Sequence, residues 1–160
     1  MSDERSTEQE TPKERADREL IELLNELRVV LPGVAVLLAF LLAVPFAKGW
    51  TRVTSFQRDV FVVAFLSTAV SVALLTAPSS YHRLRFRHGH KERIVKIGSR
   101  LAIAGIAASA VSLLAVVVLV MDFVVSRGAA IAAAAALFVV IAVLWYGLAL
   151  VARLRDRSAR

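Results

Sequence analysis

Four long stretches of apolar residues dominate the hydrophobic pattern of the chain. They cover residues 29–47, 60–78, 101–125 and 129–151. Each is close to the roughly 20 residues that a helix needs to cross a hydrocarbon core about 30 Å thick. Unpaired backbone groups are costly in lipid, so stretches of this kind cross a membrane as helices. The pattern therefore predicts an all-α fold, a four-helix transmembrane bundle.

An amphipathic segment precedes the first of these spans. Its apolar positions recur at helical spacing and are Leu20, Ile21, Leu23, Leu24 and Leu27. We expect a cytoplasmic helix whose apolar face packs on the protein, since its acidic residues disfavour adsorption to an anionic surface. Residues 1–18 are polar and predict a disordered tail. The helical membrane domain then covers 19–151, and 152–160 form a basic C-terminal tail.

Prolines and capping residues predict where the helices begin and end. Pro32 is expected in the first turn of the first span, where a missing N–H costs little. Pro45 should end that span, and Pro78 should interrupt the second. Thr54 or Ser55 is expected to cap the N-terminus of the second span.

The third and fourth spans are predicted to be antiparallel neighbours. Only the tight turn Ser126-Arg127-Gly128 separates them. Small residues four positions apart, which suit close helix contact in lipid, are Ser67 and Ser71, Ala104 and Ala108, Gly105 and Ser109, and Ala108 and Ser112. Packing within the bundle accounts for all of them. They permit a homo-oligomer without requiring one.

The distribution of Lys and Arg predicts how the chain is oriented. Of the 20 basic residues, five lie in 1–28, seven in 79–100 and four in 152–160. The alternate loops hold fewer: three lie in 48–58, and Arg127 alone lies between the third and fourth spans. Cytoplasmic loops carry the excess of Lys and Arg. Both termini are therefore expected in the cytoplasm, in a multi-pass protein of the plasma membrane.

The basic loop between the second and third spans is the main candidate for binding a lipid or a partner. Its cations are Arg83, Arg85, Arg87, Lys91, Arg93, Lys96 and Arg100. They stand beside Tyr81, Leu84 and Phe86, a mixture that suits the anionic headgroups of the cytoplasmic leaflet. The alternative is that the loop acts as a topology signal alone. Nucleic acid is not expected, although the net charge is +7, because the cations lie next to apolar spans.

Three carboxylates are candidates for handling an ion or a proton. Asp122 lies toward the outer end of the third span, Asp59 at the outer start of the second, and Glu26 at the entry of the first. One interpretation makes Asp122 an interfacial carboxylate paired with Arg127, Arg58 or Lys48. The other makes it a cation or proton site, because a carboxylate in a span is costly unless it is used. For Asp59, a structural role in the first helical turn is favoured.

The remaining side chains offer little conventional chemistry. The chain has no cysteine, and its three histidines, His82, His88 and His90, all lie in the basic loop. The positive charge of that loop would repel a divalent cation, so we expect solvated histidines and no metal site. No nucleophile elbow, phosphate loop or HExxH motif occurs. The sequence predicts neither an enzyme nor a cofactor.

Three segments resemble a known family. They are ELLNELRVVLPG at 22–33, Phe56-Gln57-Arg58, and APSSYHR at 77–83. In these segments the chain resembles an uncharacterised family of small four-span membrane proteins of actinobacteria, over about residues 18–150. The resemblance implies a membrane location but no mechanism. Some members carry a sodium:proton antiporter label.

Two functions follow as hypotheses. The first is an integral plasma-membrane protein with a structural or interaction role, which uses the basic loop toward lipid or a partner. The alternative is a small secondary transporter, a cation/proton exchanger in which Asp122, Asp59 or Glu26 titrates. The transporter needs a carboxylate whose neutralisation abolishes activity. The interaction protein should tolerate that change and respond to charge reversal in the loop.

Overall fold

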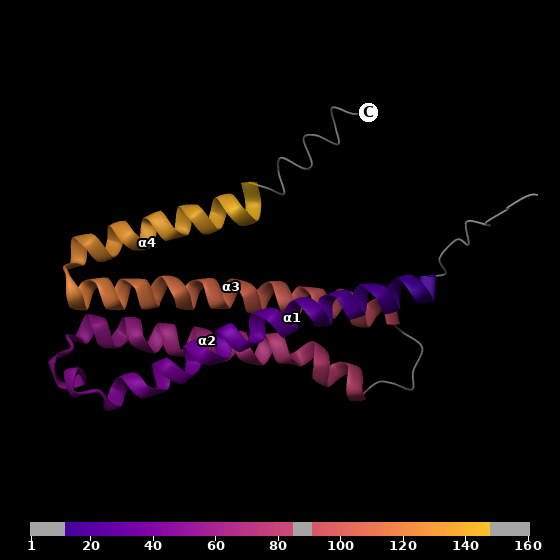
Figure 1. Cartoon of the computed structure of the whole chain (residues 1–160), viewed down its shortest axis with the longest axis horizontal. Coiled ribbons are helices and arrows are strands. Elements are labelled where there is room, and N and C mark those ends of the chain that lie inside the picture. Colours follow the sequence, from indigo (N-terminus) through magenta and orange to yellow (C-terminus); the bar gives the residue numbers. More distant parts are fainter. Residues whose placement is uncertain (1–11, 85–90, 148–160) are drawn as a thin grey trace, which may run out of the picture.

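The computed structural model describes residues 12–84 and 91–147, and this part of the chain is helical with no strand. Four α-helices follow one another: α1 (Pro12–Ala43), α2 (Ser55–Leu84), α3 (Lys91–Val124) and α4 (Arg127–Ala142) (Figure 1). Short 3-10 turns, η1 (Val44–Phe46) and η2 (Lys48–Arg52), join α1 to α2, and a π-helical segment, η3 (Val143–Gly147), extends α4. The predicted all-α fold is confirmed.

Each of the four helices is long and apolar enough to cross a membrane. The candidate spans are Leu24–Phe46, Ser55–Pro78, Ile97–Val124 and Arg127–Trp145. The start of α1, the end of α2 and the start of α3 lie at one end of the molecule, and α4 runs back toward that end (Figure 1). The α1–α2 and α3–α4 connections lie at the opposite end. The antiparallel arrangement of α3 and α4 is therefore as predicted.

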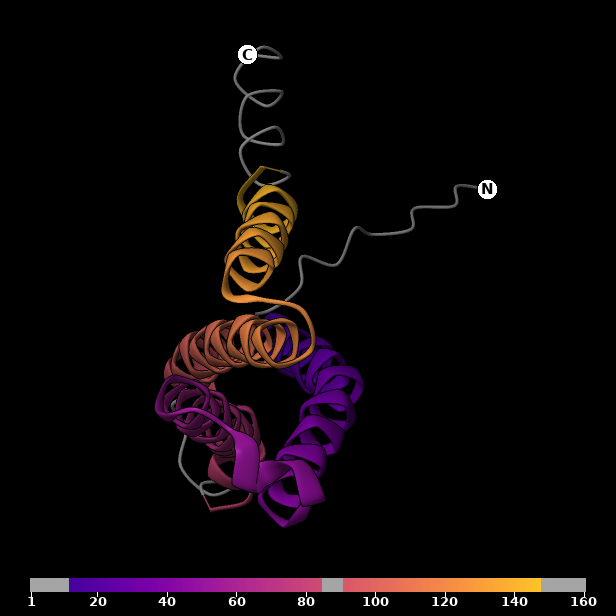
Figure 2. The same cartoon turned by 90° about the vertical axis from the view of Figure 1, so that its left-hand side faces the viewer.

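Helices α1, α2 and α3 form the bundle, and α4 stands outside it. All three pairs among α1, α2 and α3 are in contact, whereas among the described helices the backbone of α4 packs closely on α3 and not on α1 or α2 (Figure 2). Ala130, near the start of α4, is fully buried. Most large side chains of α4, such as Phe138 and Val139, are exposed in the isolated chain. This exposure fits a helix with lipid around most of its surface.

A seven-residue repeat of buried positions holds the bundle together. In α2 the buried side chains are Gln57, Phe61, Ala64, Thr68, Ser71, Leu75 and Pro78, at alternating spacings of four and three. In α1 the buried positions Leu27, Val34 and Leu41 are each seven apart. A period of 3.5 residues keeps one seam facing its neighbours and is typical of left-handed helix packing.

The core has two apolar layers with a polar layer between them. Leu41, Phe61, Ala64, Ala115 and Leu119 form one layer, near the α1–α2 connection. Leu27, Val34, Leu75 and Ala102 form the other. Between them, the buried hydroxyls of Thr68, Ser71 and Ser112 lie where α2 meets α3. The middle of the bundle thus relies on hydrogen bonds as well as on apolar packing.

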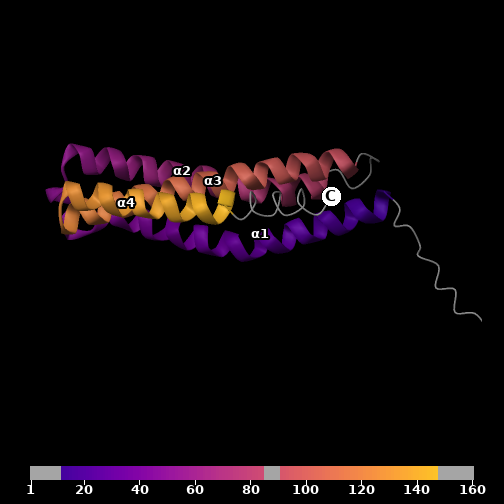
Figure 3. The ribbon, with the colours of Figure 1, turned by 90° about the horizontal axis from the view of Figure 1, so that it is seen from above.

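The structure corrects the predicted effects of two prolines. Pro32 lies well inside α1, not in a first turn, because the amphipathic segment and the first span form one continuous helix from Pro12 to Ala43. Pro32 cannot bond the carbonyl four residues before it, and α1 is bowed along its length (Figure 3). Pro78 does not interrupt α2, which continues to Leu84. By contrast, α1 does end just before Pro45, as expected.

Other boundaries also differ from those expected. α1 begins at Pro12, inside the segment 1–18 expected to be a tail, and 1–11 lie outside the described residues. The basic segment 79–100 is largely helical, as the end of α2 and the start of α3. The expected turn at 126–128 is shorter, because Arg127 and Gly128 already belong to α4. The tail 152–160 lies outside the described residues.

Candidate functional site

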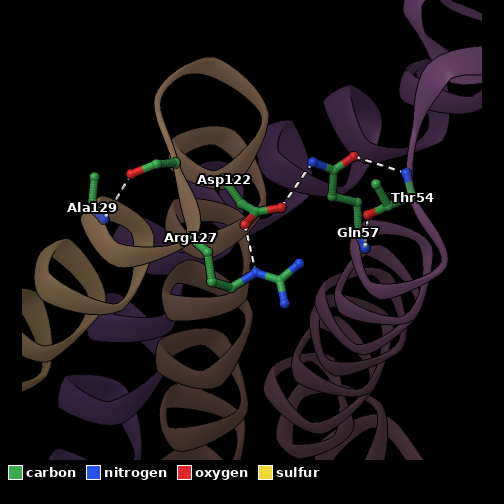
Figure 4. Close-up of polar contacts among 6 residues, drawn as sticks. Thr54, Gln57, Asp122, Arg127 and Ala129 are labelled. Carbon is green, nitrogen blue, oxygen red and sulfur yellow. Dashed lines mark hydrogen bonds and ion pairs between the residues drawn. The ribbon is translucent and has the colours of Figure 1, made fainter.

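The site begins at the N-terminus of α2, where two side chains cap the helix. The backbone N–H of Gln57 donates to Thr54 Oγ1 at 3.3 Å, and the N–H of Thr54 donates to Gln57 Oε1 at 3.0 Å (Figure 4). This reciprocal pair is a capping box, which satisfies two backbone donors that the helix leaves unpaired. Of the two capping residues predicted, Thr54 is the one used. The box also fixes the side chain of Gln57, which is 6% exposed.

Gln57 links this cap to the carboxylate of Asp122, near the end of α3. Its Nε2 donates to Asp122 Oδ2 at 2.8 Å. The other oxygen, Oδ1, accepts from Nε of Arg127 at 2.7 Å (Figure 4). The Asp122 side chain is only 6% exposed, whereas that of Arg127 is 52% exposed. Both carboxylate oxygens are therefore engaged, one by a neutral donor and one by a cation.

Arg127 brings α4 into the same cluster. It is the first residue of α4, and its guanidinium carbon lies 3.6 Å from the centre of the Phe56 ring on α2. The preceding Ser126 caps α4, because its Oγ accepts from the N–H of Ala129 at 3.3 Å (Figure 4). A cation over an aromatic face is attracted by the ring quadrupole. We call Thr54, Phe56, Gln57, Asp122 and Arg127 the Asp122 cluster; it joins α2, α3 and α4.

The structure selects one of the three partners predicted for Asp122. Arg127 forms the ion pair, while Arg58 and Lys48 are exposed and take no part in it. A carboxylate held in this way has its charge balanced at the edge of a span. Through these two bonds Asp122 links α3 to α2 and to the start of α4.

The other two candidate carboxylates do not join Asp122. Asp59 is exposed and lies in the second turn of α2, not in the first as expected. Glu26 is exposed near the start of the span Leu24–Phe46, while Asp59 and Asp122 lie toward the opposite end. Within the described residues, Glu26 makes no ion pair with Arg28, since side chains two apart on a helix do not face each other. The three acids form no common site.

A second polar cluster lies in the middle of the spans, between α2 and α3. Thr68 Oγ1 donates to the carbonyl of Ala64 at 2.7 Å, and Ser112 Oγ reaches the same carbonyl from α3 at 2.9 Å. The two hydroxyls also contact each other. Ser71 Oγ donates to the carbonyl of Gly105 at 2.7 Å. In the described residues no buried side-chain polar atom lacks a hydrogen bond, so these hydroxyls act as links between helices.

The basic loop is only partly described. Arg83 ends up in the last turn of α2, and Lys91, Arg93 and Lys96 lie in the first turns of α3. Arg100 is exposed on α3. The remaining candidates Arg85 and Arg87, and the histidines His88 and His90, lie outside the described residues, whereas His82 is on α2.

Gln57 was not among the predicted site residues, although the sequence contains a signal for its role. The segment Thr54-Ser55-Phe56-Gln57 has the spacing of a capping box, Ser or Thr followed three residues later by Glu or Gln. The hydrogen bond between Gln57 and Asp122 joins residues 65 apart in the sequence, so no local pattern predicts it. Thr68 was missed as well, since its partner Ser112 is 44 residues away.

Comparison with protein families gives a match over most of the chain. The model of a family of unknown function, DUF6328, matches residues 9–149. No curated protein and no solved structure matches the chain. The match bears out an uncharacterised family, while the actinobacterial origin and the antiporter label stay predictions from the sequence.

Proposed function

Since the chain belongs to DUF6328, whose function is unknown, we propose from its own residues that it is a plasma-membrane protein with a structural or interaction role and no enzyme activity. The observation that carries the proposal is the engagement of Asp122. Both of its oxygens are bonded, to Gln57 and to Arg127. The Asp122 carboxylate, near the outer end of the third span, is thus engaged in links between helices.

The basic segment 79–100 is the proposed binding element. It follows the second span and precedes the third, and it carries seven of the 20 Lys and Arg residues. Each cation near an anionic membrane surface adds about 1 kcal/mol of attraction. We place this segment and both termini at the cytoplasmic face, where the predicted partners are anionic headgroups or a protein. The proposal includes no cofactor and no nucleic acid, and it leaves a homo-oligomer open.

The test is photo-crosslinking in proteoliposomes with a photoactivatable phosphatidylglycerol. We expect crosslinks in 79–100, and we expect them to fall when Arg83, Arg85 and Arg87 are changed to Glu. The matched control reverses Arg153, Arg155 and Arg157, the same number of arginines in the C-terminal tail. Equal crosslinking by a photoactivatable phosphatidylcholine, or an equal loss in both variants, contradicts a specific role for the loop.

The second candidate is a cation/proton exchanger, and burial of Asp122 is the observation that favours it. A carboxylate 6% exposed in a span suits a site that binds a proton or a cation in turn. Its test is sodium-driven proton flux in proteoliposomes, read with a pH-sensitive dye. A saturable flux lost in Asp122→Asn supports the exchanger, with Asp59→Asn and Glu26→Gln testing the other two carboxylates. A flat trace from well-folded protein rules out sodium:proton exchange.

A further inference from the structure

The connection between α1 and α2 lies at the membrane surface opposite the basic loop. It falls between the candidate spans Leu24–Phe46 and Ser55–Pro78. Phe46, the last residue of the first span, is 89% exposed in the isolated chain. An aromatic side chain so fully exposed at the end of a span is best placed among lipid acyl chains. This location puts η2 at the level of the headgroups.

Aromatic contacts hold η2 firmly against the bundle. The Trp50 ring packs edge-on against Phe61 of α2, with 4.8 Å between ring centres. Gly49 lies close to α3, since a Cβ at this position would be 3.5 Å from Cζ of Phe123. The turn thus packs on α2 through Trp50 and passes next to α3 at Gly49.

Three cations at this end of the bundle, two in η2 and one near the start of α2, form no ion pair with an acid among the described residues. Lys48, Arg52 and Arg58 are exposed, and within 12–84 and 91–147 none of them forms an ion pair. The same end of the bundle holds Arg127, but its charge is balanced by Asp122. Asp59 is the other acid at this end among the described residues. Its single negative charge does not balance three cations, so an excess of positive charge remains. We call Lys48, Arg52 and Arg58 the η2 cations.

We propose that the η2 cations bind the phosphate groups of anionic phospholipids in the leaflet opposite the basic loop. Arginine presents several donors that match phosphate oxygens, and lysine adds a point charge. A lipid fits better than a soluble anion, because the exposed ring of Phe46, two residues before Lys48 in the sequence, offers a contact for an acyl chain. The surface is separate from 79–100, at the other end of the spans.

Trp50 provides a local reporter for this surface. The chain has two tryptophans, Trp50 and Trp145, and Trp145→Phe leaves Trp50 alone beside the η2 cations. In proteoliposomes, quenching of Trp50 by brominated phosphatidylglycerol is compared with quenching by brominated phosphatidylcholine at equal mole fraction. We expect phosphatidylglycerol to be enriched near Trp50 about fivefold or more over phosphatidylcholine. A fivefold preference corresponds to the attraction of about 1 kcal/mol that one Lys or Arg adds at an anionic surface.

Matched variants separate the η2 cations from the basic loop. Changing Lys48, Arg52 and Arg58 to Gln should abolish the preference. Changing the exposed Arg28 and Arg100 to Gln, toward the opposite end of the spans, should leave it intact. Arg52→Lys with Arg58→Lys keeps the charge and should keep most of the preference. A failure of the loop to crosslink lipid would not affect these results.

Two results overturn the proposal. One is equal quenching by the two brominated lipids in the parent protein. The other is a preference that persists in the folded triple variant, as judged by circular dichroism. If the triple variant does not fold, the quenching of the parent protein is measured again in about 1 M NaCl, which screens surface charges. We expect the preference for phosphatidylglycerol to disappear. A preference that salt leaves unchanged contradicts the proposal.

Discussion

At the residue scale, Gly105 shows how closely α2 and α3 approach. A Cβ at this position would lie 2.8 Å from Cγ and Cδ2 of Leu75 and 3.3 Å from Cβ of Leu74. The carbonyl of Gly105 also accepts the hydrogen bond from Ser71. Glycine thus serves both the packing and the hydrogen bonding of the central layer, as small residues do in membrane bundles.

Gly105→Ala is therefore expected to lower stability by about 1–3 kcal/mol, the usual effect of overpacking. The measurement is unfolding in detergent, followed by circular dichroism. Gly33→Ala is the matched control, because nothing lies within 4 Å of its added Cβ and alanine favours the helix. Equal destabilisation by both changes would contradict the close approach of α2 and α3 at Gly105.

Asp122 is the second residue whose environment makes a clear prediction. Asp122→Ala leaves Nε2 of the buried Gln57 without its acceptor, which should cost about 1–3 kcal/mol. Asp122→Asn keeps an acceptor oxygen for Gln57 and should lose less. Asp59→Ala removes an exposed carboxylate without an ion pair and serves as the control. The same unfolding measurement should show the largest loss of stability for Asp122→Ala, a smaller loss for Asp122→Asn and the smallest for Asp59→Ala.

At the element scale, the contact between α2 and α3 depends on paired hydroxyls. Thr68→Val and Ser112→Ala each remove one member of the pair in the middle layer. We expect each to destabilise the bundle, with a coupling of about 0.6 kcal/mol and at most about 1.7 kcal/mol in a double-mutant cycle. Ser109→Ala is the control, since that hydroxyl bonds only the carbonyl of Ile106 in its own helix. Additive losses would exclude a direct Thr68–Ser112 link.

The element scale also shows what the sequence alone could predict. Four apolar stretches sufficed for four helices, because their length and composition are local properties. The predictions that Pro32 lies in a first turn and that Pro78 interrupts the second span were wrong, since both prolines lie inside continuous helices. A proline removes only one helical hydrogen bond, so the helix can continue on both sides of it. The pairing of Asp122 with Arg127 was among the predicted alternatives, since the two are five apart. The links to Gln57, and from Thr68 to Ser112, depend on tertiary packing that no local pattern encodes.

At the scale of the whole molecule, the order of the helices gives the bundle two distinct ends. The start of α1, the end of α2 and the start of α3 lie at one end of the bundle, and α4 runs back toward that end (Figure 1). Sixteen of the 20 Lys and Arg residues belong to the segments 1–28, 79–100 and 152–160, which precede or follow the spans at that end. We propose that these spans cross a membrane four times, with that end in the cytoplasm.

The absence of cysteine makes this claim directly measurable. Single cysteines are introduced by Ser2→Cys, Gly89→Cys, Ser158→Cys, Thr51→Cys and Gly128→Cys, and intact cells are treated with a membrane-impermeant maleimide. We expect labelling of the cysteines at 51 and 128 in intact cells, and labelling at 2, 89 and 158 only after permeabilisation. The opposite pattern contradicts the orientation. Labelling of positions 2 and 51, or of 89 and 128, from the same side contradicts the four-span topology itself.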